Sequence, residues 1–223
     1  MADDDLLALE ADEEIDVVPE ELRSRLAIAL DVDDLVAAER LARKVQPWFG
    51  IAKIGLELFS AAGPDAIASM GRLGFDVFCD LKLHDIQTTV RRAARVLGGL
   101  GAHYLTIHAA GGVEMVAAGV EGLAAGAEAG GWPPPVPLGV TVLTSEKEAP
   151  PELLAERLEV AVRAGCRGVV CATADLAVVR RLAPELMTVV PGIRPEGAPA
   201  DDQRRVATPG EAMAAGADVI VVG

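Results

Sequence analysis

The sequence is poor in aromatic residues, which make up 3% of its 223 residues, although hydrophobic residues make up 51%. Its core must therefore be built from Ala, Val, Leu and Ile, as buried parallel strands and their covering helices require. It also has no apolar run of about 20 residues and no charged N-terminal segment leading into an apolar one. Neither membrane insertion nor secretion is indicated, so we expect a cytoplasmic protein.

Cysteine is scarce as well, and its spacing suggests no metal or disulfide framework. Cys79, Cys166 and Cys171 form no C-x-x-C pair and no Cys/His ligand pattern. All three lie in or beside apolar runs, so we expect reduced core residues rather than nucleophiles. His84 and His108 likewise have no carboxylate spacing that resembles a zinc site, and we expect no metal.

Positive charge is the third deficit, because 20 Lys and Arg face 34 Asp and Glu and the net charge is −14. Nucleic acid or an anionic membrane would be repelled, so the sequence predicts a small-molecule partner. If that molecule is an anion, local cations and backbone N–H groups must hold it. Many acidic residues lie in 1–22, which we expect to be a disordered tail before one domain at 23–223.

From Ser24 onward, strand-like and helix-like segments alternate. Strands are expected at 25–32, 49–55, 75–82, 103–110, 136–143, 168–173, 186–193 and 217–223, and helices at 33–45, after Gly63, and at 88–100, 113–127, 151–164, 174–183 and 209–216. Such alternation indicates a parallel sheet, and eight strands is the number in a closed (β/α)8 TIM barrel. A doubly wound open sheet is the alternative.

Nearly every expected strand ends in a polar residue or a glycine. These residues are Asp31, Lys53, Asp80 with Lys82, His108, Thr144, Thr173, Arg194 and Gly223. In a (β/α)8 barrel the C-terminal strand ends form the mouth of the active site. The sequence therefore predicts that these side chains converge on one pocket.

The segment 75–90, FDVFCDLKLHDIQTTV, places charge directly after an apolar strand. Asp80 and Lys82 share one face by alternation, and Asp85 follows the strand. A lone D-x-K is often solvated or a structural ion pair. With Lys53 from the neighbouring strand, however, these residues form an alternating row, Lys53, Asp80, Lys82 and Asp85. Such a row would repel a substrate carboxylate, stabilise the carbanion left by CO₂, and supply a proton, which predicts decarboxylation.

A family resemblance carries the same prediction. The segment DLKLHDIQTTV at 80–90, with LDV at 30–32, AKIG at 52–55, HAAGG at 108–112, VTVLTS at 140–145 and PGIR at 191–194, resembles the orotidine 5′-monophosphate decarboxylase family. The resemblance implies a cofactor-free homodimeric barrel that converts orotidylate to UMP and CO₂ in pyrimidine biosynthesis. Lys53, Asp80, Lys82 and Asp85 would be catalytic, with Lys82 protonating C6. Asp85 and Thr89 would reach into the partner's site.

The resemblance also implies the substrate contacts. Asp31 would accept a ribose hydroxyl, although it could instead be a helix N-cap. The expected contacts to the base are Thr144 and Ser145, those to the phosphate are Arg194 and Gln203, and Gly223 lies at the last strand end. A Thr-Ser pair by itself is usually a turn.

Two features depart from the family pattern. The family commonly has Pro-Asn where this sequence has Gln87-Thr88, so we expect a changed turn with the Thr89 contacts intact. The family also continues beyond the position of Gly223 with a phosphate-binding arginine and a final helix. Their apparent absence here predicts weaker phosphate binding and an apolar barrel face that the acidic N-terminal segment, a partner or nothing would cover.

Two other functions remain open from the residues. Related barrels that act on sugar phosphates share D-x-K-x-x-D but use Mg²⁺ to stabilise an enediolate, whereas Lys53 and LTS at 143–145 favour the nucleotide enzyme. A non-catalytic phosphate-binding barrel is the second alternative, and the retained charged residues argue against it.

Overall fold

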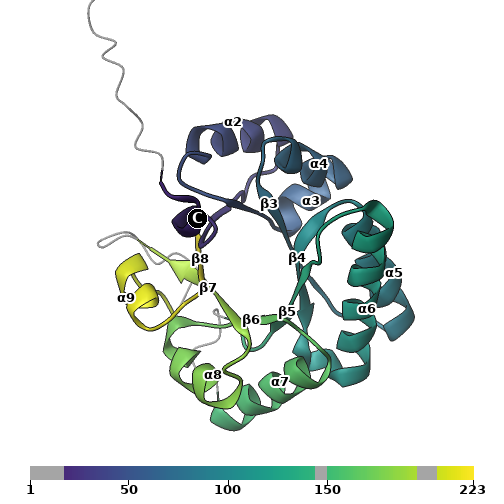
Figure 1. The fold of residues 1–223 in the computed structure, drawn as a ribbon, viewed down its shortest axis with the longest axis vertical. Coiled ribbons are helices and arrows are strands. Elements are labelled where there is room, and N and C mark those ends of the chain that lie inside the picture. The colour runs from purple at the N-terminus through teal and green to yellow at the C-terminus, as the bar shows by residue number, and fades with distance from the viewer. Residues whose placement is uncertain (1–17, 144–149, 195–204) are drawn as a thin grey trace, which may run out of the picture.

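The computed structural model describes residues 18–143, 150–194 and 205–223, and within them eight parallel strands close into a barrel (Figure 1). The strands follow the chain order, and β8 pairs with β1 to complete the ring. They are β1 Leu26–Ala29, β2 Ile51–Ile54, β3 Asp76–Leu83, β4 Ala102–His108, β5 Val136–Val140, β6 Gly168–Val170, β7 Met187–Ile193 and β8 Val219–Val222. The (β/α)8 barrel is confirmed, and the open sheet is excluded.

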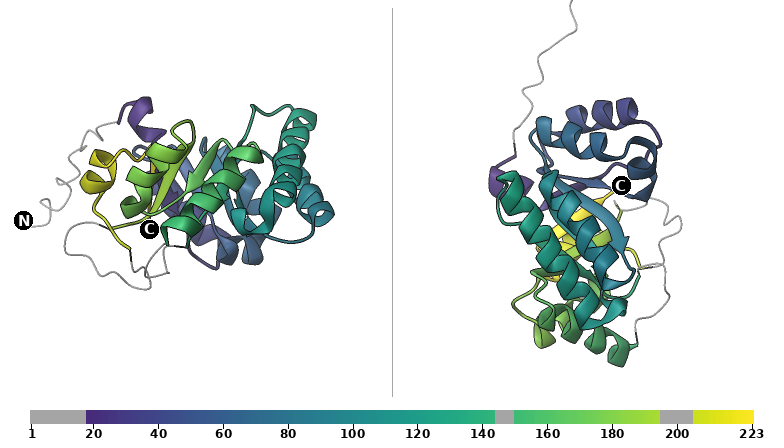
Figure 2. Two further views of the ribbon diagram at one scale, coloured as in Figure 1. Left: turned by 90° about the horizontal axis from the view of Figure 1, so that it is seen from below. Right: turned by 90° about the vertical axis from the view of Figure 1, so that its right-hand side faces the viewer.

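Helices surround this barrel, as the side views show (Figure 2). They are α1 Glu20–Arg23, α2 Leu35–Val45, α3 Leu56–Ala62, α4 Pro64–Arg72, α5 Gln87–Gly99, α6 Gly112–Gly130, α7 Pro151–Arg163, α8 Leu176–Leu182 and α9 Pro209–Ala214, with 3₁₀ turns η1 Ala109–Gly111 and η2 Thr173–Asp175. The sequence missed α3, which ends at Gly63, where a φ of +57° turns the chain into α4. None of the described helices is long and apolar enough to cross a membrane.

The predicted acidic tail is only partly covered by the structure. Residues 1–17 lie outside the described residues, and residues 20–22 belong to α1. At the end of α1 the guanidinium of Arg23 donates to the carbonyl of Gln46, which attaches this turn to the end of α2. The boundary between tail and domain stays a prediction.

Strand alternation separates the core into two layers. One layer fills the barrel and includes Ala27, Ala29, Ile51, Phe78, Tyr104, Val136, Leu138, Val189, Val219 and Val221. The other lies between the barrel and its helices and includes Ile28, Leu30 and Ile220. Ile28 and Ile220 face outward beside β8 and are nevertheless buried. At these two residues the apolar face expected beside the last strand is therefore covered within the chain.

Glycines bring α5 and α6 unusually close together on one side of the barrel (Figures 1 and 2). A Cβ atom at Gly122 would overlap the backbone of Arg91, and one at Gly126 would overlap the backbone of Arg95. From the other side, a Cβ at Gly98 would overlap the carbonyl of Leu123. The close contact of the two helices therefore depends on the absence of side chains at these positions.

A polar network lies at the N-terminal ends of β7 and β8. Arg180 Nη2 donates to Asp218 Oδ2 at 2.7 Å, and the Thr188 hydroxyl donates to the same oxygen at 2.9 Å. Burial alone would raise the pKa of Asp218, but hydrogen bonds from the Thr188 N–H and from Arg180 outweigh it and lower the pKa. This network is structural and lies at the end of the barrel opposite the strand ends that were predicted to carry function.

Candidate active site

A cavity of about 420 Å³ opens at the C-terminal ends of the strands. Its size falls within the range of small-molecule sites. Six of the residues that the sequence predicts for the site line it, namely Asp31, Lys53, Asp80, Lys82, Arg194 and Gly223. Apolar side chains form much of the remaining wall and include Phe78, Val140, Val142, Val170, Val189 and Val221. The expected convergence holds for these six residues, whereas His108 and Thr173 do not line the cavity and Thr144 lies outside the described residues.

Four charged side chains form an alternating row along this cavity. Lys53 Nζ lies 3.0 Å from Asp31 Oδ1 and 3.9 Å from Asp80 Oδ2. Lys82 Nζ lies 2.8 Å from the same oxygen of Asp80. Within one chain the row is therefore Asp31, Lys53, Asp80 and Lys82. Asp31 adds a carboxylate beside Lys53, whereas Asp85, expected at the Lys82 end of the row, is not part of it.

The inner part of the row is the most strongly coupled. The side chains of Lys53 and Asp80 are 11% and 15% exposed, whereas that of Asp31 is 58% exposed. At an effective dielectric constant of about 20, opposite charges 4 Å apart attract by about 4 kcal/mol before desolvation is counted. Solvent screens the contact to Asp31 more strongly. Lys53 is thus held between two carboxylates, and it follows Ile51 on the same inward face of β2.

A bulge in β3 sets the position of Lys82. Cys79 pairs with Leu105 and Leu83 with Ile107, so β3 advances four residues (79 to 83) while β4 advances two (105 to 107). Within this bulge Lys82 has a φ of +49°, a left-handed conformation that costs energy for a residue with a side chain. Bulges of this kind re-aim side chains next to active sites. Here Asp80 and Lys82 both line the cavity.

Thr106 is a contact of these residues that the sequence analysis did not select. Its hydroxyl lies 3.0 Å from Asp80 Oδ1 and 2.9 Å from the backbone nitrogen of Lys82. The available signal was alternation, because Thr106 follows Tyr104 on the face of β4 that fills the barrel. Nothing in the sequence showed that β4 would place this hydroxyl beside both residues.

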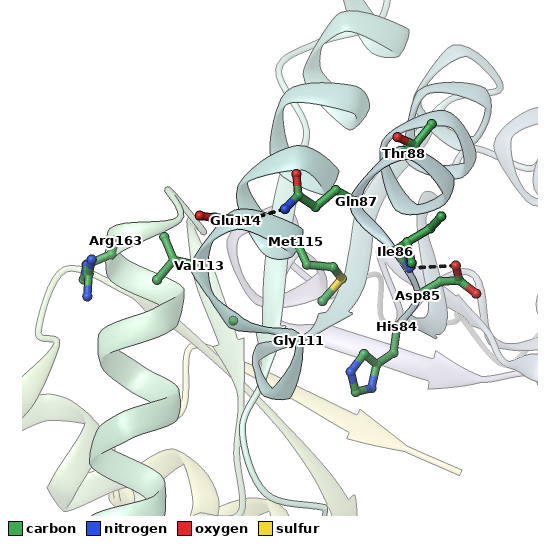
Figure 3. A pocket seen from close by; sticks show the side chains of 11 residues that line it. His84, Asp85, Ile86, Gln87, Thr88, Gly111, Val113, Glu114, Met115 and Arg163 are labelled. Atoms are coloured by element: carbon green, nitrogen blue, oxygen red, sulfur yellow. Dashed lines mark hydrogen bonds between the residues drawn. The ribbon is translucent and has the colours of Figure 1, made fainter.

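Asp85 and Thr89 do not line the barrel cavity. Asp85 instead lines a second, more open pocket with His84, Ile86 and Gln87, and its carboxylate accepts a 2.7 Å hydrogen bond from the Ile86 N–H (Figure 3). Thr89 is exposed on α5. Their role in a partner's site stays a prediction, as does the effect of Gln87-Thr88, where α5 begins.

Arg194 and Gly223 meet at the rim of the cavity. Arg194 Nη1 donates to the carbonyl oxygens of Gly223, at 3.2 Å, and of Ile193, at 3.1 Å. This places a guanidinium at the cavity wall, where it could bind an anionic group. The other predicted contacts, Thr144, Ser145 and Gln203, lie outside the described residues.

The chain resembles known proteins over most of its length. A family model described as "Orotidine 5'-phosphate decarboxylase / HUMPS family" matches residues 24–223. The chain belongs to this family. It is 50% identical over 210 residues to a protein named orotidine 5′-phosphate decarboxylase from Anaeromyxobacter sp. (strain K), covering 89% of each chain. It is 42% identical over 214 residues to one so named from Moorella thermoacetica, covering 90% of this chain and 84% of that one.

Solved structures of the orotidine 5′-phosphate decarboxylase family agree with this assignment. The crystal structure of the enzyme of that name from Lactobacillus acidophilus has a TM-score of 0.74 at 33% identity, covering 89% of each chain. The one from Pyrococcus horikoshii OT3 has a TM-score of 0.70 at 27% identity, covering 89% of this chain and 88% of that one. The similarity in sequence and in structure thus extends over nearly the whole barrel.

A buried ion pair supports one wall of the cavity. The sequence did not predict this pair. Arg205 Nη1 lies 2.6 Å from Asp175 Oδ2, and both side chains are almost fully buried. Arg205 Nη2 donates to the carbonyls of Val142, at 3.3 Å, and Leu143, at 3.1 Å. Because Val142 and Leu143 line the cavity, Arg205 connects that wall to the 3₁₀ turn η2.

The cysteines behave as the sequence predicts. Cys79, Cys166 and Cys171 are all free and buried, and burial raises the pKa of each thiol to about 12. His84 is exposed, and the centroid of its ring lies 5.5 Å from that of the His108 ring. Within the described ranges, no three His, Cys, Asp or Glu residues are grouped as metal ligands would be.

Proposed function

We propose that this chain is a cytoplasmic orotidine 5′-phosphate decarboxylase of pyrimidine biosynthesis that acts without a cofactor. The observation that carries the proposal is the row Asp31, Lys53, Asp80 and Lys82 at the mouth of the barrel. It is supported by relatives of that name at up to 50% identity among those compared. A binding site alone would not require two lysines and two carboxylates held in alternation inside a partly dry cavity.

The row suits a reaction in which negative charge moves from a leaving carboxylate to the adjacent carbon. Beside Asp80 the substrate carboxylate would be repelled, and this repulsion disappears as CO₂ leaves. The C6–carboxylate bond breaks and its electron pair stays on C6, where the ammonium of Lys82 stabilises it. Lys82 then donates a proton to C6 to form UMP and recovers one from water. Its 2.8 Å contact with Asp80 supports this role, because a substrate carboxylate beside Asp80 would also lie next to the ammonium of Lys82.

The two ends of the cavity would hold the rest of the nucleotide. Asp31, which is more than half exposed and accepts from Lys53, is available to a ribose hydroxyl. Arg194 lies at the rim beside Gly223, where its guanidinium could bind phosphate oxygens. The apolar wall between these ends, which includes Val140 and Val142, would exclude water from the pyrimidine.

The decarboxylase would work as a homodimer, in which Asp85 and Thr89 complete the partner's site. In support, Asp85 lies in an open pocket beside Ile86, an apolar side chain that is 71% exposed in the single chain. An equimolar mixture of Lys82→Ala and Asp85→Asn chains, unfolded and refolded together, should recover about one quarter of the wild-type activity, because mixed dimers contain one intact site. No recovery above the separate variants would exclude the shared site.

The activity is tested by the loss of orotidylate absorbance with purified protein. We expect turnover that EDTA does not affect, and a decrease in kcat of roughly 10²–10⁴-fold in Lys82→Ala, the range of general-acid contributions. Lys44→Ala is the matched control, because Lys44 is an exposed lysine at the end of α2. Full activity in Lys82→Ala would refute the assigned proton donor. Orotidylate turnover abolished by EDTA would refute the reaction without a cofactor and favour the metal-dependent alternative.

A further inference from the structure

The hydrogen bonds of Thr106 have only one possible direction. The Lys82 N–H can only donate, so the Thr106 oxygen accepts from it at 2.9 Å. The hydroxyl proton is then free to point at Asp80 Oδ1, which lies 3.0 Å away. Thr106 is fully buried, so no solvent molecule competes for either contact. One hydroxyl thus links the carboxylate of Asp80 to the main chain of Lys82.

Both partners of this hydroxyl need such a restraint. Asp80 must keep its second oxygen, Oδ2, towards the ammonium groups of Lys53 and Lys82, and a hydrogen bond to Oδ1 fixes the rotation of the carboxylate. Lys82 has a left-handed φ of +49°, which persists only when neighbouring contacts hold it. The hydrogen bond from its N–H to β4 bridges the bulge where the regular strand pairing is interrupted.

We propose that Thr106 is a positioning residue of the decarboxylation reaction, acting through Asp80 and Lys82 without touching the substrate. The inference rests on the proposed function, because it assigns the two residues their roles in the reaction. It predicts that the hydroxyl, rather than the methyl group or the volume of Thr106, sets the rate. The effect falls on the step in which the carboxylate leaves and C6 is protonated.

Two matched pairs of variants separate the hydroxyl from the rest of the side chain. Thr106→Val keeps the shape and removes the hydroxyl, and Thr106→Ser and Thr106→Ala differ from each other by the hydroxyl alone. We expect kcat to fall by roughly 10- to 100-fold in the Val and Ala variants, as for a buried polar group left unpaired, and by less than about threefold in the Ser variant. UMP affinity should change by less than about threefold in all of them, because UMP has no carboxylate for Asp80 to repel.

Thr188→Val is the control for general damage to the barrel. Thr188 is also fully buried on a strand and also donates to an aspartate, Asp218, but at the opposite end of the barrel. This variant should lose stability and keep the wild-type kcat at a temperature where it is folded. A crystal structure of Thr106→Val gives a readout independent of turnover. It should show Lys82 out of its left-handed conformation, or Asp80 rotated away from Lys82.

Different results would overturn the role of Thr106 and the proposed decarboxylase function. Loss of activity in Lys82→Ala together with wild-type kcat in Thr106→Val would leave the decarboxylase mechanism standing and overturn the role of Thr106. A Thr106→Ser variant as slow as Thr106→Ala would overturn it too, because the methyl group would then be responsible. Absence of orotidylate turnover in the wild-type chain would overturn both.

Discussion

Because α5 and α6 are in close backbone contact, we predict that the substitution Gly126→Ala lowers the free energy of unfolding. A Cβ atom there would overlap the Arg95 carbonyl oxygen and lie 2.8 Å from the Arg95 carbonyl carbon and 2.9 Å from the Gly99 nitrogen. These are backbone atoms, so a rotamer change cannot relieve the overlap and the helices must separate. Overpacking costs about 1–3 kcal/mol or more, and replacing a helical glycine by alanine returns about 1 kcal/mol. Because the overlap is with backbone atoms, we expect a cost at the upper end of this range, about 3 kcal/mol, and a net loss of about 2 kcal/mol.

The assay is urea unfolding followed by circular dichroism, with Gly71→Ala as the matched control. Gly71 also lies in a helix, α4, but a Cβ atom there would meet nothing within 4 Å. Only the helix propensity then changes, so this variant should gain up to about 1 kcal/mol. For a domain of this size, a loss of about 2 kcal/mol corresponds to a decrease in Tm of roughly 4–8 °C.

The two substitutions are expected to change the free energy of unfolding in opposite directions, so the measurement can contradict the explanation. If Gly126→Ala were as stable as the wild type, the contact between the helices would not be as close as the backbone positions indicate. If both variants lost stability equally, a general intolerance of alanine rather than helix contact would be responsible. Because α5 begins at Gln87, two residues after Asp85, separation of the helices should also disturb the region proposed to enter the partner's site.

Two further predictions concern titration and a buried ion pair. Burial lowers the pKa of His108 below 6.5 in the folded chain, and the positive charges of His84 and Lys82 lower it further. The contribution of His108 to stability is therefore complete above pH 6.5, and it is lost as the pH falls towards the pKa of His108 in the folded chain. His108→Asn should therefore flatten the pH dependence of the unfolding free energy between pH 5 and pH 7.5, and an unchanged slope would contradict this assignment. Arg205→Met should lower the free energy of unfolding by about 3 kcal/mol, because it leaves the buried Asp175 without its ion-pair partner. The double variant with Asp175→Asn should lose less, and an equal loss in urea unfolding would show that the pair is not the cause.

Much of the fold could be predicted because it depends on short-range patterns. Apolar runs that alternate with helical segments identify all eight strands to within a few residues, and glycine and proline mark their ends. The helix α3, Leu56–Ala62, was missed because seven residues are too few to show a clear helical pattern, although the break at Gly63 was recognised. The convergence of Lys53, Asp80 and Lys82 followed from the same information, since the carboxyl ends of parallel strands must share one side of a closed barrel.

The contacts of Asp31 and Thr106 inside the site could not be predicted, because they depend on which residues of separate strands lie opposite one another. Asp31 and Lys53 are 22 residues apart, and Thr106 and Asp80 are 26 apart, so neither pair belongs to a local pattern. The sequence alone determined a barrel with charged strand ends and a family resemblance. Only the tertiary structure decided that Asp31 joins the row beside Lys53, that Lys82 lies in a bulge, and that the buried hydroxyl of Thr106 links Lys82 to Asp80. The physical reason is that a shift of one residue in strand pairing would move each of these atoms by several ångströms, and only the packed barrel selects the pairing.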